Sequence, residues 1–294
     1  MFGWIWQNIF YNPILNISMV LYHAFGDNLG WAIIVLAILF RLLLLPLVKK
    51  QNEMSKKMAT LKPQLDALQK KYANNKEKLS QEQIKLYRKV GYNPLGCLTT
   101  VLPQFLIVII LSNVIRNIGI NNLSGMYPFV HNFVSGGNEI SVNMGFLGID
   151  LTKIFTQIDP RFGKEGITYL ALSLIVGLSQ FAASKFTMVM QKNLTGQSTS
   201  KKKEEKKKKK TKAATEEETL QKVQEGLGKS TSFILPAMTV FFAIKMPAYL
   251  SVYWIAQSLA LVLQYMILDW DKSKKGVQNL FTQLKKKKDS KTEK

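Results

Sequence analysis

Cysteine and histidine are almost absent from this sequence of 294 residues, which contains one cysteine, Cys97, and two histidines, His23 and His131. A single cysteine excludes a framework of intramolecular disulfides, and so few ligand-type side chains disfavour a His/Cys zinc site. The sequence also lacks the HExxH and GxSxG patterns of metalloproteases and hydrolases. We therefore expect a protein that is not an enzyme and that needs neither a metal nor another cofactor.

Acidic residues are also scarce, because 19 Asp and Glu stand against 40 Lys and Arg, a formal net charge of +21. In a soluble protein this balance would suggest nucleic-acid binding. The charges are segregated, however, since residues 1–48 contain only Asp27 and Arg41, whereas residues 201–212 contain nine lysines. This segregation indicates a polytopic membrane protein with basic loops.

Five apolar stretches are predicted to cross the membrane. A span needs about 20 mostly apolar residues. The fourth stretch is shorter than this, so it needs flanking residues or a thinned bilayer. The predicted spans are residues 29–48, 98–115, 167–190, 230–244 and 248–268. The predicted fold class is an all-α polytopic membrane protein with a five-helix core.

The positions of lysine and arginine predict the orientation. Residues 49–97, 185–229 and 269–294 contain 12, 13 and nine basic residues, whereas residues 116–166 contain four, balanced by four acidic residues. Because basic loops stay in the cytoplasm, we expect an external N-terminus and a cytoplasmic C-terminus. On this topology 116–166 is an extracytoplasmic loop, 191–229 a basic cytoplasmic loop and 269–294 a basic tail. No transit peptide is visible, which favours the bacterial cytoplasmic membrane.

Residues 1–28 are apolar but are interrupted by Asn8, Asn12, Asn16 and His23. They show neither the basic start nor the small-residue cleavage site of a signal peptide. We favour an amphipathic helix in the outer interface over a sixth span.

Residues 49–97 are predicted to form an antiparallel helical hairpin in the cytoplasm. Apolar residues recur at intervals of four and three from Met54 to Tyr72, which is a heptad seam. Asn74-Asn75 then marks a turn before a second helical segment, and Pro63 should kink the first helix or begin a new one. The hairpin would contact a partner or lipid headgroups, or it would simply link two spans; the periodicity does not choose between these roles.

Arg41 lies inside the first span, eight residues before Lys49, so about 12 Å of helix separates it from the cytoplasmic boundary. A lone arginine near mid-membrane costs about 2.5–3.5 kcal/mol on insertion scales, and no acidic residue occurs in the five predicted spans. Snorkelling is disfavoured, because the side chain reaches only roughly 6–7 Å. We expect a water-filled cavity open to the cytoplasm, in which Arg41 attracts an acidic group of a substrate.

Polar residues of the other spans are the candidate walls of this cavity. Each of them alone fits a helix–helix hydrogen bond better than a cavity wall. They are Gln104, Ser112, Ser179, Gln180, Gln257, Ser258 and Gln264.

Four segments, in this order and spacing, resemble the YidC-type membrane protein insertases, a family that includes the Oxa insertases of mitochondria and the Albino insertases of thylakoids. They are RLLLLPLVKKQNEMSKKMATLKPQLDALQKKY (41–72), GYNPLGCLTTVLPQF (91–105), FLGIDL (146–151) and MPAYLSVYWIAQSLALVLQ (246–264). The resemblance implies a five-span core, a cytoplasmic helical hairpin and a hydrophilic groove open to cytoplasm and lipid. It also implies insertion and intramembrane chaperoning of nascent membrane proteins, without nucleotide or metal.

The resemblance also implies roles for residues. Arg41 matches the groove arginine of the family, and Tyr253 and Trp254 match an aromatic pair close to bound clients. The predicted client-binding groove consists of Arg41, Gln104, Ser112, Gln180, Gln257, Tyr253 and Trp254.

The basic tail matches a region that commonly engages the ribosome, and its basic run is Lys285, Lys286, Lys287 and Lys288. Anionic lipid headgroups are a second partner for this run. A Sec-type translocation channel stays open as a further partner, and no small-molecule substrate is expected.

The chain departs from the family pattern in three respects. It has no lipobox cysteine before the first span, it lacks the large extracytoplasmic domain of Gram-negative members, and Ala248 stands where glycine is usual. Two other function classes stay open. A small-solute transporter or channel is disfavoured by the lack of an internal repeat and of acidic residues in the spans, and in a ribosome-tethering membrane anchor only the basic tails would matter.

Overall fold

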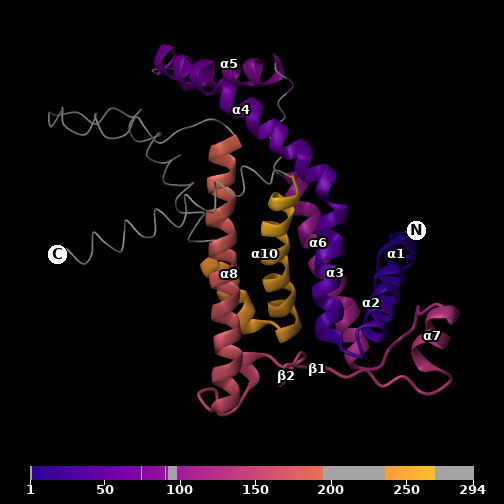
Figure 1. The fold of residues 1–294 in the computed structure, drawn as a ribbon. Helices are drawn as coiled ribbons and strands as arrows, with labels where there is room; N and C mark the ends of the chain where they lie inside the picture. The colour runs from indigo at the N-terminus through magenta and orange to yellow at the C-terminus, as the bar shows by residue number, and fades with distance from the viewer. Residues whose placement is uncertain (1, 74, 90, 92–97, 195–235, 269–294) are drawn as a thin grey trace. The chain divides into compact units, whose positions relative to one another are not determined.

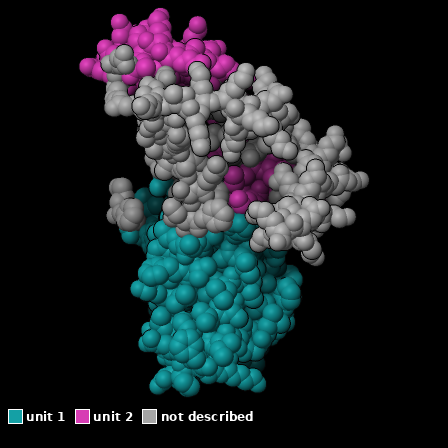
Figure 2. Space-filling model, turned by 90° about the vertical axis from the view of Figure 1, so that its left-hand side faces the viewer, with its two compact units in different colours: residues 1–44, 101–183, 235–264 teal, residues 45–100, 184–234, 265–294 magenta. Residues whose placement is uncertain are grey.

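The computed structural model describes residues 2–73, 75–89, 91, 98–194 and 236–268, and these are almost entirely helical (Figure 1). The chain forms two compact units, coloured in Figure 2. Unit 1 comprises residues 1–44, 101–183 and 235–264, and unit 2 comprises residues 45–100, 184–234 and 265–294.

Unit 1 begins with an unbroken helical run made of α1 (Phe2–Ile5), the π-helical η1 (Trp6–Tyr11) and α2 (Asn12–Ala24). Asn28 then caps the next helix, α3 (Leu29–Leu43), by accepting a hydrogen bond from the backbone N–H of Trp31. Helices α2 and α3 pack against each other as a hairpin. A helix therefore forms within residues 1–28, and its place in the interface stays a prediction.

Three helical segments of the described residues are long and apolar enough to cross a membrane. They are Leu102–Gly119 of α6 (Leu98–Gly119), Lys164–Met190 of α8 (Lys164–Leu194) and the whole of α10 (Ala248–Leu268). A fourth span results if α3 and the start of α4 (Leu45–Lys71) count as one broken span. The predicted class, an all-α multi-pass membrane protein, is confirmed.

In two of the predicted spans the helix is broken or is described only in part. The first, 29–48, is interrupted at Leu44, because Pro46 has no N–H to donate to the carbonyl of Leu42 and its ring disfavours helical geometry before it. The fourth, 230–244, corresponds to the apolar helix Pro236–Lys245, and its earlier residues lie outside the described part. The count of five spans stays a prediction.

The core of unit 1 is formed by apolar faces of α2, α3, α6 and α10. Leu15, Ile33, Leu111 and Tyr253 are among the side chains that are completely or almost completely buried there. Helix α8 approaches the helix Pro236–Lys245 closely at Gly177, where a Cβ atom would overlap the side chain of Val240.

A short antiparallel hairpin follows α6 and the amphipathic helix α7 (Pro128–Ser135). Strand β1 (Gly145–Phe146) pairs with β2 (Ile149–Asp150), with Gly145 opposite Asp150. Leu147 and Gly148 form the two-residue turn with φ values of 51° and 79°, the positive pair that defines a type I′ turn. The 3₁₀ helix η3 (Phe155–Gln157) leads on to α8.

Unit 2 contains the rest of α4 and α5 (Lys76–Lys89). Helix α4 continues through Pro63, and Leu61 and Leu65 of the predicted heptad seam are buried. Asn75 caps α5 by accepting a hydrogen bond from the backbone N–H of Lys78 at 2.9 Å. The two helices of the predicted cytoplasmic hairpin are present, and its antiparallel packing and location stay predictions.

Candidate functional site

Four polar side chains from three helices of unit 1 form one hydrogen-bonded group, which we call the polar cluster: Arg41, Gln104, Tyr253 and Gln257. Gln257 is its centre, because its Nε2 donates to Oε1 of Gln104 at 3.0 Å and to the hydroxyl of Tyr253 at 2.8 Å. Its Oε1 accepts from Nη1 of Arg41 at 3.5 Å. Nε2 of Gln104 also donates to the Tyr253 hydroxyl, at 3.4 Å.

Helix geometry explains why these residues meet. Tyr253 and Gln257 are four residues apart on α10 and therefore lie on one face of it. α3 supplies Arg41 and α6 supplies Gln104, and both helices share the apolar core of unit 1 with α10. The polar cluster is thus built into the packing of three apolar helices.

The polar cluster is shielded from its surroundings. Tyr253 is 0% exposed and Gln257 is 6% exposed, while Arg41 and Gln104 are half-buried. Buried polar groups are costly unless they are hydrogen-bonded, above all in a membrane, so the mutual contacts stabilise the arrangement. The guanidinium of Arg41 is the only formal charge among these four residues, which makes the site electropositive.

Exposed apolar side chains adjoin the polar cluster in the sequence. Leu42 follows Arg41, and Phe105 follows Gln104; both are exposed. Large exposed apolar residues recur along the same helices at Leu39, Leu43, Leu102, Ile109, Leu259, Leu263 and Ile267. In a membrane-spanning helix such surfaces face lipid, so polar and lipid-facing groups occur in the same segments.

The other predicted groove residues lie outside the polar cluster. Ser112 on α6 is 3.3 Å from the hydroxyl of Tyr249 on α10, and Trp254 packs against the apolar core. Gln180 is half-buried on α8, and among the described residues no hydrogen bond joins it to the polar cluster. The lysines at 285–288 lie outside the described residues.

Gln264 differs from the other buried polar residues of α10. Its side chain is 2% exposed, and neither amide atom has a hydrogen-bond partner among the residues that the structure describes. By contrast, Ser258 donates to the carbonyl of Trp254 at 2.9 Å and accepts from Ser179 at 3.4 Å. Gln264 lies seven residues beyond Gln257 on the same face of α10. The buried polar face of this helix therefore continues past the polar cluster to an amide without hydrogen bonds among the described residues.

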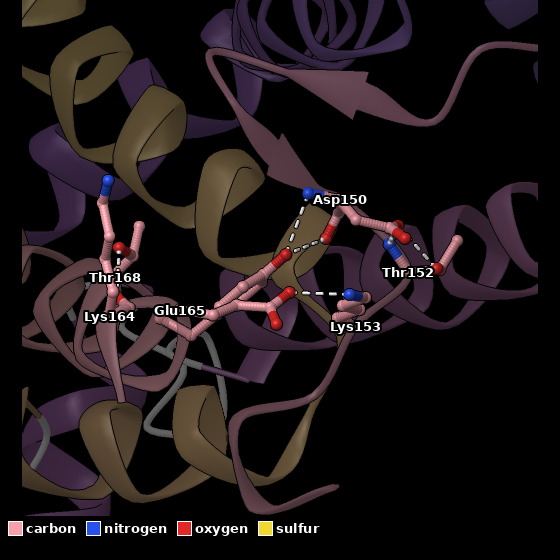
Figure 3. Close-up of polar contacts among 7 residues, drawn as sticks. Asp150, Thr152, Lys153, Lys164, Glu165 and Thr168 are labelled. Carbon is pink, nitrogen blue, oxygen red and sulfur yellow. Dashed lines mark hydrogen bonds and ion pairs between the residues drawn. The ribbon is translucent and has the colours of Figure 1, made fainter. Parts of the chain in front are cut away.

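A second polar group, which the sequence did not indicate, joins the start of α8 to the β-hairpin (Figure 3). The hydroxyl of Tyr169 accepts from the backbone N–H of Asp150 at 2.8 Å and donates to its carbonyl at 2.9 Å. Nζ of Lys153 donates to the carboxylate of Glu165 at 2.6 Å, and this hydrogen bond raises the pKa of Lys153. We call these four residues the outer clamp, because the predicted topology places them at the outer side of the membrane.

The segment that carries the outer clamp also holds the start of α10. The backbone N–H of Ala248 donates to the carbonyl of Lys153 at 3.0 Å, and that of Tyr249 donates to Leu151 at 2.9 Å. The first N–H groups of a helix have no partner inside it, so the loop supplies the acceptors that α10 needs. No sequence pattern signals these contacts, because they join backbone atoms of distant segments.

Comparison with known proteins places the chain in a family. The family model described as 60Kd inner membrane protein matches residues 20–275. The membrane protein insertase YidC 2 of Bacillus anthracis is 28% identical over 90% of this chain and 81% of its own length. The membrane protein insertase MisCA of Bacillus subtilis is 26% identical over 92% of this chain and 82% of its own length.

A plant relative is longer. The chloroplast ALBINO3-like protein 1 of Arabidopsis thaliana is 28% identical over 88% of this chain, which spans only 47% of that protein. The family-model match over residues 20–275 includes most of the described helices. The chain belongs to the 60Kd inner membrane protein family, which is the YidC/Oxa/Albino family of membrane insertases.

Proposed function

We propose that this chain is a membrane protein insertase and intramembrane chaperone of a bacterial cytoplasmic membrane. The observation that carries the proposal is the polar cluster, in which Arg41 brings a positive charge into otherwise apolar helices. Family membership supports it, since the Bacillus relatives are named insertases. The five-span core, the external N-terminus and the cytoplasmic hairpin of residues 49–97 are parts of the same proposal.

The proposed mechanism begins with attraction. A polar or acidic flank of a nascent client enters a groove open to cytoplasm and lipid and approaches the guanidinium of Arg41. Gln104, which is half-buried in the same cluster, presents its amide group, and this replaces part of the hydration that the flank loses. Two unit charges 4 Å apart attract by about 4 kcal/mol at an effective dielectric constant of 20, which is enough to hold the flank partway into the bilayer.

Lipid burial supplies the driving force of the second step. The apolar segment of the client leaves along exposed apolar surfaces such as Leu42 and Phe105. Each CH₂ group transferred from water contributes about 0.8 kcal/mol, so no nucleotide is needed. The outer clamp supports a groove that is closed on the outer side, because its contacts connect α8 and α10 through one loop.

Other partners follow from charge alone. Lys285, Lys286, Lys287 and Lys288 are proposed to contact the translating ribosome or anionic headgroups, and both interactions would weaken with salt. A Sec-type channel is a further proposed partner.

The test uses purified full-length protein in vesicles and two clients that differ only in an acidic or neutral translocated tail. Arg41→Ala should lower the insertion rate of the acidic-tail client about tenfold, equivalent to about 1.4 kcal/mol, and affect the neutral-tail client less. Arg116→Ala is the matched control, since this exposed arginine is near the other end of α6.

Equal rates for Arg41→Ala and the unmodified protein would refute the role of the charge. Uptake of small solutes by the same vesicles, without any effect on client insertion, would favour a transporter. Loss of all activity on deletion of 272–294 would favour a ribosome-tethering anchor.

A further inference from the structure

Five large apolar side chains are exposed in the segment between α6 and α8. Three of them lie in α7 and in the turn of the β-hairpin, and we call these three the outer apolar set. Leu147 is 80% exposed, Phe129 is 70% exposed and Phe133 is 53% exposed. None of them belongs to a helix that could span the membrane. Their exposure therefore needs an explanation other than the lipid around the spans.

The β-hairpin holds Leu147 at the ends of three helices. Phe146 packs against Gly30 at the start of α3, so closely that a Cβ atom on Gly30 would overlap its ring. On the other strand, Asp150 is bonded to Tyr169 near the start of α8. The same segment accepts the first N–H groups of α10. Leu147 is thus fixed at the level where apolar helices begin.

Helix α7 holds the two phenylalanines in a comparable way. Val130 is buried in the core, and the side-chain carbonyl of Asn16 on α2 accepts from the backbone N–H of Tyr127 at 2.7 Å. Phe133 makes an edge contact with His23 near the end of α2, with ring centroids 5.0 Å apart. One face of α7 is therefore packed, and Phe129 and Phe133 remain on the exposed side.

The charge of the segment favours lipid as the occupant. Residues 117–149 contain one charged residue, Glu139, although the whole chain has 59 charged residues in 294. A loop in water would carry more charge, whereas interfacial segments combine apolar and aromatic side chains with uncharged polar ones. The hairpin also adjoins Trp31, an exposed tryptophan at the start of α3 whose ring contacts Phe146 edge-on at 5.8 Å. The turn that carries Leu147 thus lies beside an exposed aromatic side chain at the start of α3.

The backbone of Leu147 gives an independent indication. Its φ of 51° lies in the left-handed region, where type I′ turns usually have Asn, Asp or Gly. A leucine is strained there, and sequences depart from local preference mainly where a side chain has a function.

We propose that Phe129, Phe133 and Leu147 insert into the boundary between headgroups and acyl chains of the leaflet at the N-terminal end of α3, and so anchor the 117–149 segment to lipid. The proposal rests on the membrane embedding of the protein and is independent of client binding. It assigns lipid as the partner of α7 and of the hairpin turn.

The experiment measures lipid contact directly. In a Cys97→Ser background, Leu147→Cys, Phe129→Cys and Phe133→Cys are each labelled with an environment-sensitive fluorophore. The full chain is then reconstituted into phosphatidylcholine–phosphatidylglycerol vesicles. Asn138→Cys is the matched control, an exposed position of the same segment next to Glu139. Thermal unfolding in detergent checks that each protein is folded, which we expect because the three side chains are outside the core.

Spin-labelled lipid should quench the label at the three positions at least about twofold more strongly than at Asn138, with a blue-shifted emission. Iodide in the aqueous phase should quench the label at Asn138 more strongly than at the three positions. If iodide quenches position 147 or 129 as strongly as 138, these side chains face water, the lipid proposal is wrong, and a protein partner becomes the better explanation. The Arg41→Ala assay is independent of this result, so failure of either proposal can be recognised.

Discussion

The phenolic oxygen of Tyr253 allows a sharp test of the polar cluster. Tyr253→Phe removes one oxygen atom and keeps the ring in a fully buried position. The oxygen accepts a bond of 2.8 Å from Gln257 and a longer one of 3.4 Å from Gln104. After the substitution, Nε2 of Gln257 keeps only its bond of 3.0 Å to Gln104.

The expected cost follows from these distances. A buried hydrogen bond contributes about 0.5–1.5 kcal/mol net, and side-chain pairs in a membrane protein average about 0.6 kcal/mol. One good and one long bond therefore give about 1–1.5 kcal/mol for Tyr253→Phe. Tyr249→Phe is the matched control, because its hydroxyl makes only long contacts of 3.3 and 3.5 Å to Ser112. These distances exceed the usual optimum, so about 0.5 kcal/mol or less is expected there.

Thermal unfolding of the two variants in detergent, at one fixed scan rate, measures the difference. Each kcal/mol of lost stability lowers Tm by about 2–4 °C. We therefore expect Tm to fall by about 2–6 °C for Tyr253→Phe and by about 2 °C or less for Tyr249→Phe. If the two variants shift Tm equally, or if Tyr249→Phe shifts it more, the hydrogen bonds do not stabilise the polar cluster as inferred.

Three further substitutions test other contacts, each by its change in Tm. Gln264→Leu should raise stability by about 1–2 kcal/mol, because it removes a buried amide without partners among the described residues; a lower Tm would contradict this account. Gly30→Ala should cost about 1–3 kcal/mol through overlap with the ring of Phe146, whereas Gly3→Ala, with open space around it, should not destabilise. Lys153→Met should matter little at neutral pH, because both partners of the Glu165 ion pair are exposed. Since the pKa of Lys153 is raised, the ion pair contributes fully to stability below about pH 10, and this contribution is lost as the pH rises through that pKa. A Tm difference between Lys153→Met and the unmodified protein that is larger at high pH than at pH 7 would refute this account.

The spans could be predicted because hydropathy is a local property. The predicted span 248–268 coincides with α10. The break at Leu44 could also have been predicted from the sequence, because Pro46 causes it. Hydropathy alone nevertheless predicts 29–48 as one continuous helix.

Membership of the polar cluster could be predicted only in part. The spacing of Tyr253 and Gln257 gives them a common face of α10, whereas the rotation of α3, α6 and α8 depends on packing between distant segments. Gln104 therefore joins the polar cluster and Gln180 does not. The outer clamp could not be predicted, because Tyr169 binds backbone atoms of Asp150 rather than a complementary side chain.

The hydrogen bonds around Gln257 all run in one direction. Arg41 can only donate, so the carbonyl end of Gln257 must face it, and the amide N–H groups must face Gln104 and Tyr253. Both glutamines donate to the phenolic oxygen, and neither bond uses its proton. The hydroxyl of Tyr253, which is fully buried, thus acts as an acceptor in both bonds. A single guanidinium on α3 thus fixes how the amide of Gln257 is oriented on α10, and through it the amide of Gln104 on α6.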